Sequence, residues 1–371
     1  MKARRDGVIV LALFCGLAAL FLPLAEARWM LQPAALLAWL VSLAGGALLL
    51  RRPFGAPAAA LLLVVGCLLG AVALHIVMTA GAKGLDAAGL WLGLIGLGLL
   101  VWRMLDRVSA VVAARPGLVG ATLAPLLLGL WLLYLWEMVV VGFAVPAVLL
   151  PPPSAIGHAI LANLPTLGID FVQTFVRAVI PGFAIGSAAG FLVGVLVDRV
   201  PFLQRGLMPV GNLVSALPII GVAPIMVMWF GFDWQSKAAV VVIMTFFPML
   251  VNTIAGLNAL GRIERDLMTT YAASYVQTLL AARLPAALPF VFNALKVNAT
   301  LALIGAIVAE FFGTPIVGMG FRISTEVGRM NIPTVWATIA VAALAGSASY
   351  GLIALVERWL TFWHPSFRKT S

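Results

Sequence analysis

The residues that could do chemistry in this chain are few and lie far apart in the sequence. His75, His158 and His364 are isolated, and Cys15 and Cys67 lie in separate apolar runs. Neither set has the spacing of a metal site or of a disulfide framework. The sequence contains no Gly-x-x-x-x-Gly-Lys-Ser/Thr phosphate loop and no Gly-x-Ser-x-Gly nucleophile motif. We therefore predict a chain that is not an enzyme, has no ATPase site of its own and binds no cofactor or metal.

Three polar residues inside apolar runs are candidates for binding or gating a solute: Asn252, Asn298 and Glu310. Polar and ionisable groups are costly in a bilayer, so those that occur there often mark a translocation path. For each amide taken alone, hydrogen bonding between helices is the preferred explanation. For Glu310, an ion pair with Arg322 or Arg329 and a position at the membrane interface are further alternatives. We predict that the three together line or gate a path.

The elements that position these residues are expected to be membrane-spanning helices. Hydrophobic residues make up 63% of the chain and charged residues only 10%, whereas soluble proteins carry about 25% charged residues. The mean hydropathy is +1.12. The net charge of +10 resides in short connections between apolar runs, which indicates topology signals beside anionic lipid rather than nucleic-acid binding.

A span needs about 20 mostly apolar residues, and on that basis we predict an all-α polytopic membrane protein with about ten transmembrane helices. The expected spans are Val8–Leu24, Ala34–Leu50, Ala58–Met78, Ala88–Val101, Ala121–Val141, Val176–Val197, Leu207–Phe230, Ala238–Leu257, Val291–Phe312 and Val335–Val356. The first could also be read as a cleaved signal peptide, although a retained span is the preferred interpretation.

The distribution of Lys and Arg predicts the orientation. With the N-terminus in the cytoplasm, 17 of the 23 basic residues fall on the cytoplasmic side. The other six are Arg28, Lys83, Arg177, Lys237, Arg322 and Arg329. This topology places both termini and the polar stretch Arg262–Pro289 in the cytoplasm.

The chain is expected to have two parts. Residues 1–115 hold about four spans with little internal polarity and end in a basic linker at Pro116-Gly117, which suggests an accessory block. Residues 116–371 hold about six spans and most of the polar side chains. Within them, Gly182, Gly186, Gly190 and Gly194 predict close helix packing. Pro218 and Pro224 predict a broken helix of the kind found beside transport paths.

The stretch Arg262–Pro289 cannot span a membrane because it carries Arg262, Glu264, Arg265, Asp266 and Arg283. Apolar residues recur in it at intervals of three and four, which predicts a short amphipathic helix. Leu284-Pro285 is expected to break this helix before the next span. Such a helix at the membrane face is typical of a docking surface for a soluble partner.

This stretch resembles the EAA loop of binding-protein-dependent ABC importer permeases. Aligned on Leu284-Pro285, the loop's glutamate corresponds to Asp266 and its glycine to Ala272. Residues from about 149 to 363 resemble the branch for sulfonates, nitrate and thiamine precursors, through LPPPSAIGHAI and PIIGVAPIMVMWFGFDWQSK. The resemblance implies a type I importer fold with extra N-terminal helices and a cytoplasmic coupling loop at 262–289.

The same resemblance implies partners and roles. Asp266, Ala272, Ser274, Leu284 and Pro285 would couple the chain to two ATPase subunits, which use ATP and Mg²⁺. A second permease copy, expected to make a homodimer, and a periplasmic or lipid-anchored substrate-binding protein would complete a complex in the bacterial inner membrane.

The resembling branch carries both anions and neutral heterocycles. Because the expected path has Asn and Ser but few cations to replace an anion's hydration, we expect a polar heterocycle such as a pyrimidine, a thiamine precursor or riboflavin. The alternatives are nitrate, a sulfonate such as taurine, or bicarbonate. From another class, an ion-gradient-driven secondary transporter remains open; it would require repeat halves with paired broken spans.

Overall fold

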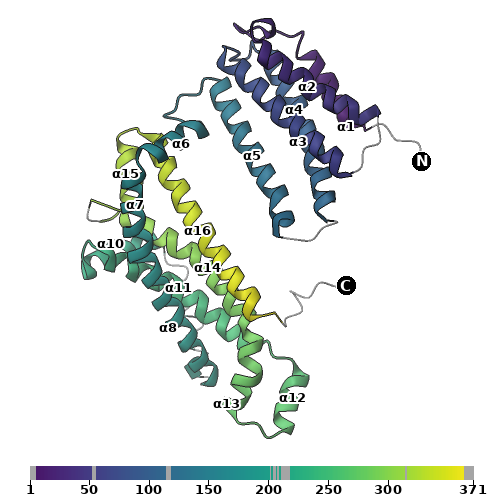
Figure 1. The fold of residues 1–371 in the computed structure, drawn as a ribbon. Coiled ribbons are helices and arrows are strands. Elements are labelled where there is room, and N and C mark those ends of the chain that lie inside the picture. The colour runs from purple at the N-terminus through teal and green to yellow at the C-terminus, as the bar shows by residue number, and fades with distance from the viewer. Residues whose placement is uncertain are drawn as a thin grey trace. The chain divides into compact units, whose positions relative to one another are not determined.

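The computed structural model describes residues 6–51, 56–113, 118–200, 202–203, 206, 209, 218–313 and 316–362. The described residues are helical and contain no strand, apart from one isolated bridge between Leu24 and Ala27. The chain forms two compact units, Met1–Ile156 (unit 1) and Gly157–Ser371 (unit 2). Figure 1 shows the helices in chain order.

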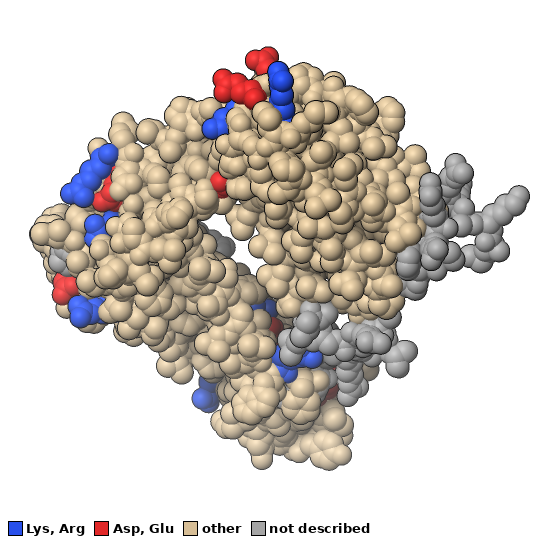
Figure 2. Space-filling view, turned by 45° about the horizontal axis from the view of Figure 1, so that its top comes forward, with Lys and Arg blue, Asp and Glu red and all other residues tan. Residues whose placement is uncertain are grey.

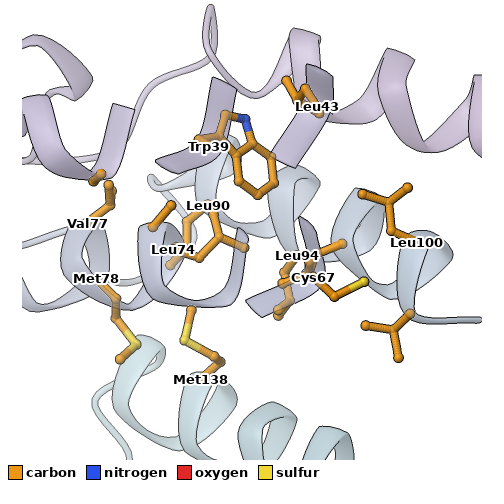
Figure 3. Close-up of a cluster of buried hydrophobic side chains, with 14 of the residues drawn as sticks. Trp39, Leu43, Cys67, Leu74, Val77, Met78, Leu90, Leu94, Leu100 and Met138 are labelled. Carbon is orange, nitrogen blue, oxygen red and sulfur yellow. The ribbon is translucent and has the colours of Figure 1, made fainter. Parts of the chain in front are cut away.

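Unit 1 is a bundle of apolar helices with its own core. Its elements are α1 (Gly7–Ala18), η1 (Trp29–Leu31), α2 (Pro33–Arg51), α3 (Ala56–Thr79), α4 (Ala88–Ala113) and α5 (Leu118–Gly142). Trp39 lies at the centre of the core among Leu74, Leu90 and other buried side chains (Figure 3). Its indole Nε1 donates to the Gly16 carbonyl at 3.0 Å, which satisfies the one polar atom of the ring.

Helix α5 packs as part of unit 1. Met138 is buried in the unit's core, and the Tyr134 hydroxyl donates to the Ala71 carbonyl in α3 at 2.8 Å. The compact units therefore divide later in the chain than the predicted boundary at 115/116. Compactness does not decide which helices belong to a permease core, so the assignment of 1–115 and 116–371 stays a prediction.

Unit 2 contains the remaining helices. They are α6 (Pro153–Ala162), which begins before the division, α7 (Leu164–Phe171), the π-helix η2 (Val172–Val179), α8 (Ile180–Arg199), α10 (Ile219–Phe230), α11 (Trp234–Leu257), α12 (Arg262–Thr270), α13 (Tyr275–Thr278), the π-helix η3 (Leu279–Arg283), α14 (Leu284–Glu310), α15 (Met319–Gly328) and α16 (Ile332–Leu360). Helices α12 and α13 lie at one end of this unit and α15 at the other (Figure 1).

The glycine stripe of α8 lies directly against α11, as predicted. A Cβ added at Gly182 would stand 2.8 Å from the Ala238 carbonyl oxygen, and one at Gly186 would stand 2.7 Å from the Val242 carbonyl oxygen. Real side chains do not approach backbone this closely. The bare backbone therefore permits an axis separation that alanine would prevent.

The fold class is confirmed as an all-α polytopic membrane protein. Eight helical runs in the described residues are long and apolar enough to cross a membrane. Two of the ten expected spans are not among them: α1 has 12 residues, and much of the seventh span, residues 207–208 and 210–217, lies outside the described residues. Figure 2 shows charged side chains in small groups on an otherwise uncharged face.

The predicted break at Pro218 and Pro224 is only partly seen, because α10 begins after Pro218 and runs without interruption through Pro224. Residues 114–117, which include the predicted linker end at Pro116-Gly117, lie outside the described residues.

Candidate functional site

A nine-residue helix, α12, stands at one end of unit 2 without a buried residue. Ile263, Leu267 and Tyr271 follow one another at intervals of four and are 83%, 50% and 76% exposed. At this spacing they form one apolar stripe along the helix and the residue that follows it. The predicted amphipathic helix is thus present, and no described residue covers its apolar face.

The chain reverses after α12 through a turn that needs an unusual backbone conformation. Ala272 has φ +51°, in the left-handed region. The Ala272 amide donates to the Thr269 carbonyl and the Ala273 amide to the Met268 carbonyl. These two bonds constitute a Schellman motif, whose left-handed position is usually occupied by glycine. The alanine that replaces the expected family glycine therefore occupies the one position in the turn where a Cβ is disfavoured.

A capping box starts the next helix. The Ser274 hydroxyl accepts from the Gln277 amide, and the Gln277 side chain accepts from the Ser274 amide. From Tyr275 the chain is helical without interruption to Glu310, so the predicted break at Leu284-Pro285 is wrong. The wider π turn of η3 directly precedes α14 and its Pro285. Since proline has no N–H, one carbonyl of the preceding turn accepts no helical hydrogen bond from it.

Arg283 fastens this segment to the ends of two long helices. Its Nη1 and Nη2 donate to Asp198 Oδ2 and Oδ1 in α8, each at 2.7 Å. Its Nε donates to the Leu257 carbonyl, at the end of α11, at 3.0 Å. The Asp198 side chain is 4% exposed and that of Arg283 is 16% exposed. Each of the three guanidinium nitrogens thus donates a hydrogen bond within unit 2.

Aromatic and apolar contacts complete the junction. The Tyr275 hydroxyl donates to Asp198 Oδ2 at 3.3 Å, and the Arg199 guanidinium lies 5.2 Å from the centre of the Tyr275 ring. Leu257 and Leu279 are buried together beneath them, with Leu284 packed against this small core. The segment 262–283 therefore combines an uncovered helix with a firmly held base.

The predicted coupling residues lie in this segment but differ in surroundings. Asp266 is exposed and approaches Arg262 at 3.9 Å, one turn away on α12. Ala272 and Ser274 form the turn, and Leu284 and Pro285 begin α14 behind the π turn. Their roles stay predictions, because no ATPase is present to contact them.

A second polar cluster lies at the opposite end of α14. Glu310 is 3% exposed; its Oε1 accepts from the Thr174 hydroxyl at 2.8 Å and its Oε2 from the Gly320 amide at 2.6 Å. The Thr174 oxygen also accepts from the Met319 amide at 2.7 Å. Glu310 thus holds the N-terminus of α15, where free backbone amides favour negative charge.

The arginines considered as partners of Glu310 bind other acids. Arg322 Nε donates to Asp170 Oδ2 at 2.8 Å, and Asp170 Oδ1 accepts from the Gly318 amide at 2.8 Å. Arg329 donates to Glu326 at 3.1 Å. Asp170 and Glu310 therefore hold the same helix terminus from two different helices.

The two asparagines predicted for a path bind within the helix bundle. Asn298 is fully buried, and its amide nitrogen donates to Ser187 Oγ at 3.1 Å and to the Thr245 carbonyl at 2.7 Å. It joins α14 to α8 and α11. Asn252 is half-buried and donates to the Pro248 carbonyl, four residues earlier, at 2.8 Å. No hydrogen bond between described residues connects Asn252, Asn298 and Glu310, and their role in a path stays a prediction.

Sequence reasoning missed the partners that hold these positions, namely Asp198, Asp170 and Thr174. A signal existed for Asp198, because an acid at the end of an apolar span needs a cation nearby. The polar loop supplied several candidates, and spacing alone could not select Arg283. Asp170 and Thr174 are 140 and 136 residues from Glu310, so only the fold brings them together.

Comparison with known proteins agrees with this geometry. Residues 182–362 match the family described as the binding-protein-dependent transport system inner membrane component. The riboflavin transport system permease protein of Chloroflexus aurantiacus is 30% identical over 237 residues, which cover 63% of this chain and 88% of the relative.

Two other relatives carry different solutes by name. The formylaminopyrimidine transport permease protein of Halalkalibacterium halodurans is 30% identical over 65% of this chain and 96% of its own length. The taurine transport system permease protein of Escherichia coli is 27% identical over 63% of this chain and 86% of its own length.

Proposed function

Because the chain belongs to the binding-protein-dependent transport system inner membrane components, the permeases of ABC importers, we propose that its 262–283 segment is the surface on which an ATPase subunit docks. The family places the chain in the inner membrane as a transport component of a complex with an ATPase and a binding protein. This membership favours ATP-driven import over the ion-gradient alternative.

One observation carries the docking proposal. Ile263, Leu267 and Tyr271 expose an apolar stripe on a helix that has no buried residue and whose other side chains include six that are charged or carry a hydroxyl. A soluble partner that covered the stripe would remove this apolar surface from water. The Arg283–Asp198 junction would then carry any displacement of α12 and α13 to α8 and α11.

The mechanism that follows is alternating access. Two ATPase copies, each using ATP and Mg²⁺, would grip the segments of two permease copies in a homodimer. Their closure would shift the segments and reopen the path on the other side, where a substrate-binding protein delivers its solute. In this arrangement both termini and the 262–283 segment are cytoplasmic, as the distribution of basic residues favours.

For the substrate we propose a polar heterocycle such as a pyrimidine, a thiamine precursor or riboflavin. Two relatives at 30% identity are named for riboflavin and formylaminopyrimidine transport, and the amides predicted for the path suit neutral polar groups. The alternative is an anion, since other relatives are named for aliphatic sulfonates, taurine and bicarbonate.

The docking proposal is tested by co-purification from the native membrane. We expect an ATPase subunit to purify with the wild-type chain but not with Leu267→Glu, which places a charge within the stripe. Arg265→Ala, a change on the opposite side of α12, is the matched control and should retain the ATPase. Ala272→Glu should also abolish assembly. Equal recovery of the ATPase with Leu267→Glu would refute docking on this stripe.

A further inference from the structure

A pocket of about 430 Å³ opens on unit 2 where α7 passes into the π-helix η2. Its lining includes Pro165, Ile169, Val172, Gln173, Arg177 and Val317. Arg177 precedes Arg199 by 22 residues of continuous helix, or roughly 33 Å at 1.5 Å per residue. The pocket therefore lies at the far end of this helix from the 262–283 segment.

The guanidinium at this pocket is held by a chain of hydrogen bonds. Arg177 Nη1 donates to Gln173 Oε1 at 3.2 Å, and Gln173 Nε2 donates to Asp233 Oδ1 at 3.0 Å. The same Asp233 oxygen accepts from the Trp234 amide at 2.8 Å. The hydrogen bond from Gln173, followed by that from Trp234, lowers the pKa of Asp233, so the acid remains an acceptor and fixes which end of the Gln173 amide faces Arg177.

Arg177 and Lys237 are the cations at this end of unit 2 that form no ion pair among the described residues. Arg322 and Arg329 each bind an acid, at 2.8 and 3.1 Å, and Lys237 donates to the Phe232 and Asp233 carbonyls. All 13 acidic side chains of the chain fall within the described residues. None of them lies within 4.0 Å of Arg177, whose charge acts on Asp233 only at longer range and contributes to its lowered pKa. The guanidinium therefore lines the pocket without a direct ion pair.

The backbone at the pocket is a π-helix of eight residues. Such turns are rare and occur often at functional sites. Here the wider turn places Gln173 and Thr174 inside the bundle, toward Asp233 and Glu310, while Arg177 stays at the pocket's edge.

We propose that this pocket binds an oxyanion group carried on an apolar body, with Arg177 as the ligand-binding residue and Gln173 as the residue that positions it. A guanidinium matches the two oxygens of a carboxylate, sulfonate or phosphate in one plane. The apolar side chains of Ile169, Val172 and Val317 supply the surface for the rest of the molecule. An organic anion in solution and the headgroup of an anionic phospholipid both offer this chemistry.

This inference does not depend on the proposed ATPase docking or on which solute is carried. It is tested with the purified full-length chain in detergent free of phospholipid, by calorimetric titration with benzenesulfonate. Benzenesulfonamide, which is neutral and of similar shape, is the control ligand. Arg329→Gln removes an exposed arginine at the same end and is the matched control variant.

We expect benzenesulfonate to bind one site and benzenesulfonamide to bind at least about tenfold more weakly, because hydrogen bonds to charged groups are the stronger ones. Arg177→Gln should lower the affinity for benzenesulfonate by roughly 10- to 100-fold, whereas Arg329→Gln should leave this affinity unchanged. Gln173→Leu, which leaves the arginine but removes its support, should have a smaller effect, and Arg177→Lys should be intermediate.

A second arm identifies the source of the anion. Dioleoylphosphatidylglycerol is added and lipid binding is counted by native mass spectrometry. Binding that depends on Arg177 for the lipid but not for benzenesulfonate would support the pocket and assign it to a headgroup. The proposal is overturned if neither probe depends on Arg177. Should Arg177→Gln fail to fold, Arg177→Lys and Gln173→Leu provide the same comparison.

Discussion

Arg283 and Asp198 meet through two parallel hydrogen bonds of 2.7 Å, although 85 residues separate them. The pair joins the last turn of η3 to the last turn of α8. Since Arg283 also binds the Leu257 carbonyl, one side chain connects the base of the 262–283 segment to two long helices. A planar, two-point contact resists rotation as well as separation, which suits a junction that transmits movement.

Breaking the Arg283–Asp198 ion pair should lower the free energy of unfolding of the chain. Loss of one partner of a buried ion pair costs about 3–5 kcal/mol; because Arg283 keeps some exposure, we expect about 2–3 kcal/mol for Asp198→Ala. Thermal unfolding of the purified chain measures the loss. Asp266→Ala, which removes an exposed carboxylate 3.9 Å from Arg262, should cost less than about 0.5 kcal/mol.

A second prediction concerns the proposed transmission of movement through the Arg283–Asp198 pair. In the assembled complex, Arg283→Lys should retain ATP hydrolysis but transport less solute for each ATP, because a lysine keeps the charge and loses the two-point contact. An unchanged ratio of transport to hydrolysis would show that the pair only stabilises the fold.

Replacing Ala272 with glycine should stabilise the turn that follows α12. A non-glycine residue in the left-handed region is strained by about 1 kcal/mol, so Ala272→Gly should stabilise the turn by about 0.5–1 kcal/mol. Ala272→Val should destabilise it, since β-branching adds to the strain. Hydrogen exchange of peptides covering α12 measures both, with Ala273→Gly as the neighbouring control. Faster exchange of α12 in Ala272→Gly than in the wild type would contradict the assigned turn.

The glycine stripe of α8 should not accept even one methyl group. In Gly186→Ala the new Cβ would meet the Val242 carbonyl oxygen at 2.7 Å, so α8 and α11 must separate. We expect a loss of about 1–3 kcal/mol, as for other overpacked sites. Gly351→Ala in α16 is the matched control, because nothing lies within 4 Å of its added Cβ; there alanine should be neutral or stabilising. Unfolding temperatures that fall equally in both variants would refute the packing argument.

These sites show which features a single sequence reveals. Apolar runs and the excluded charges of 262–289 were enough to predict eight of the ten expected spans and the polar helix, because bilayer thickness and desolvation act on composition directly. The spacing of four between Gly182, Gly186, Gly190 and Gly194 also predicted a packed helix face. This pattern lies within one helix, so no distant partner is needed to recognise it.

The partners of polar groups depend on distant segments instead. Glu310 was a candidate from its position in an apolar run, but Thr174 and the Gly320 amide become its neighbours only when α14, η2 and α15 assemble. The break expected at Pro285 failed for a related reason. The chain stays helical across Pro285, with the wider π turn of η3 directly before it, and that turn has no signal in the sequence.

The Thr174 hydroxyl should control the order of α15. It donates to Glu310 and accepts from the Met319 amide, so Thr174→Val leaves two buried groups with one bond fewer at nearly constant volume. Leaving such a group unsatisfied costs about 1–3 kcal/mol. We expect faster hydrogen exchange in peptides covering Met319–Gly328, and little change in α12 at the far end of unit 2. Thr174→Ser, which keeps the hydroxyl, should restore protection of α15. If Thr174→Val protects α15 as well as the wild type does, the N-terminus of this helix is held by Asp170 and Glu310 without help from the threonine.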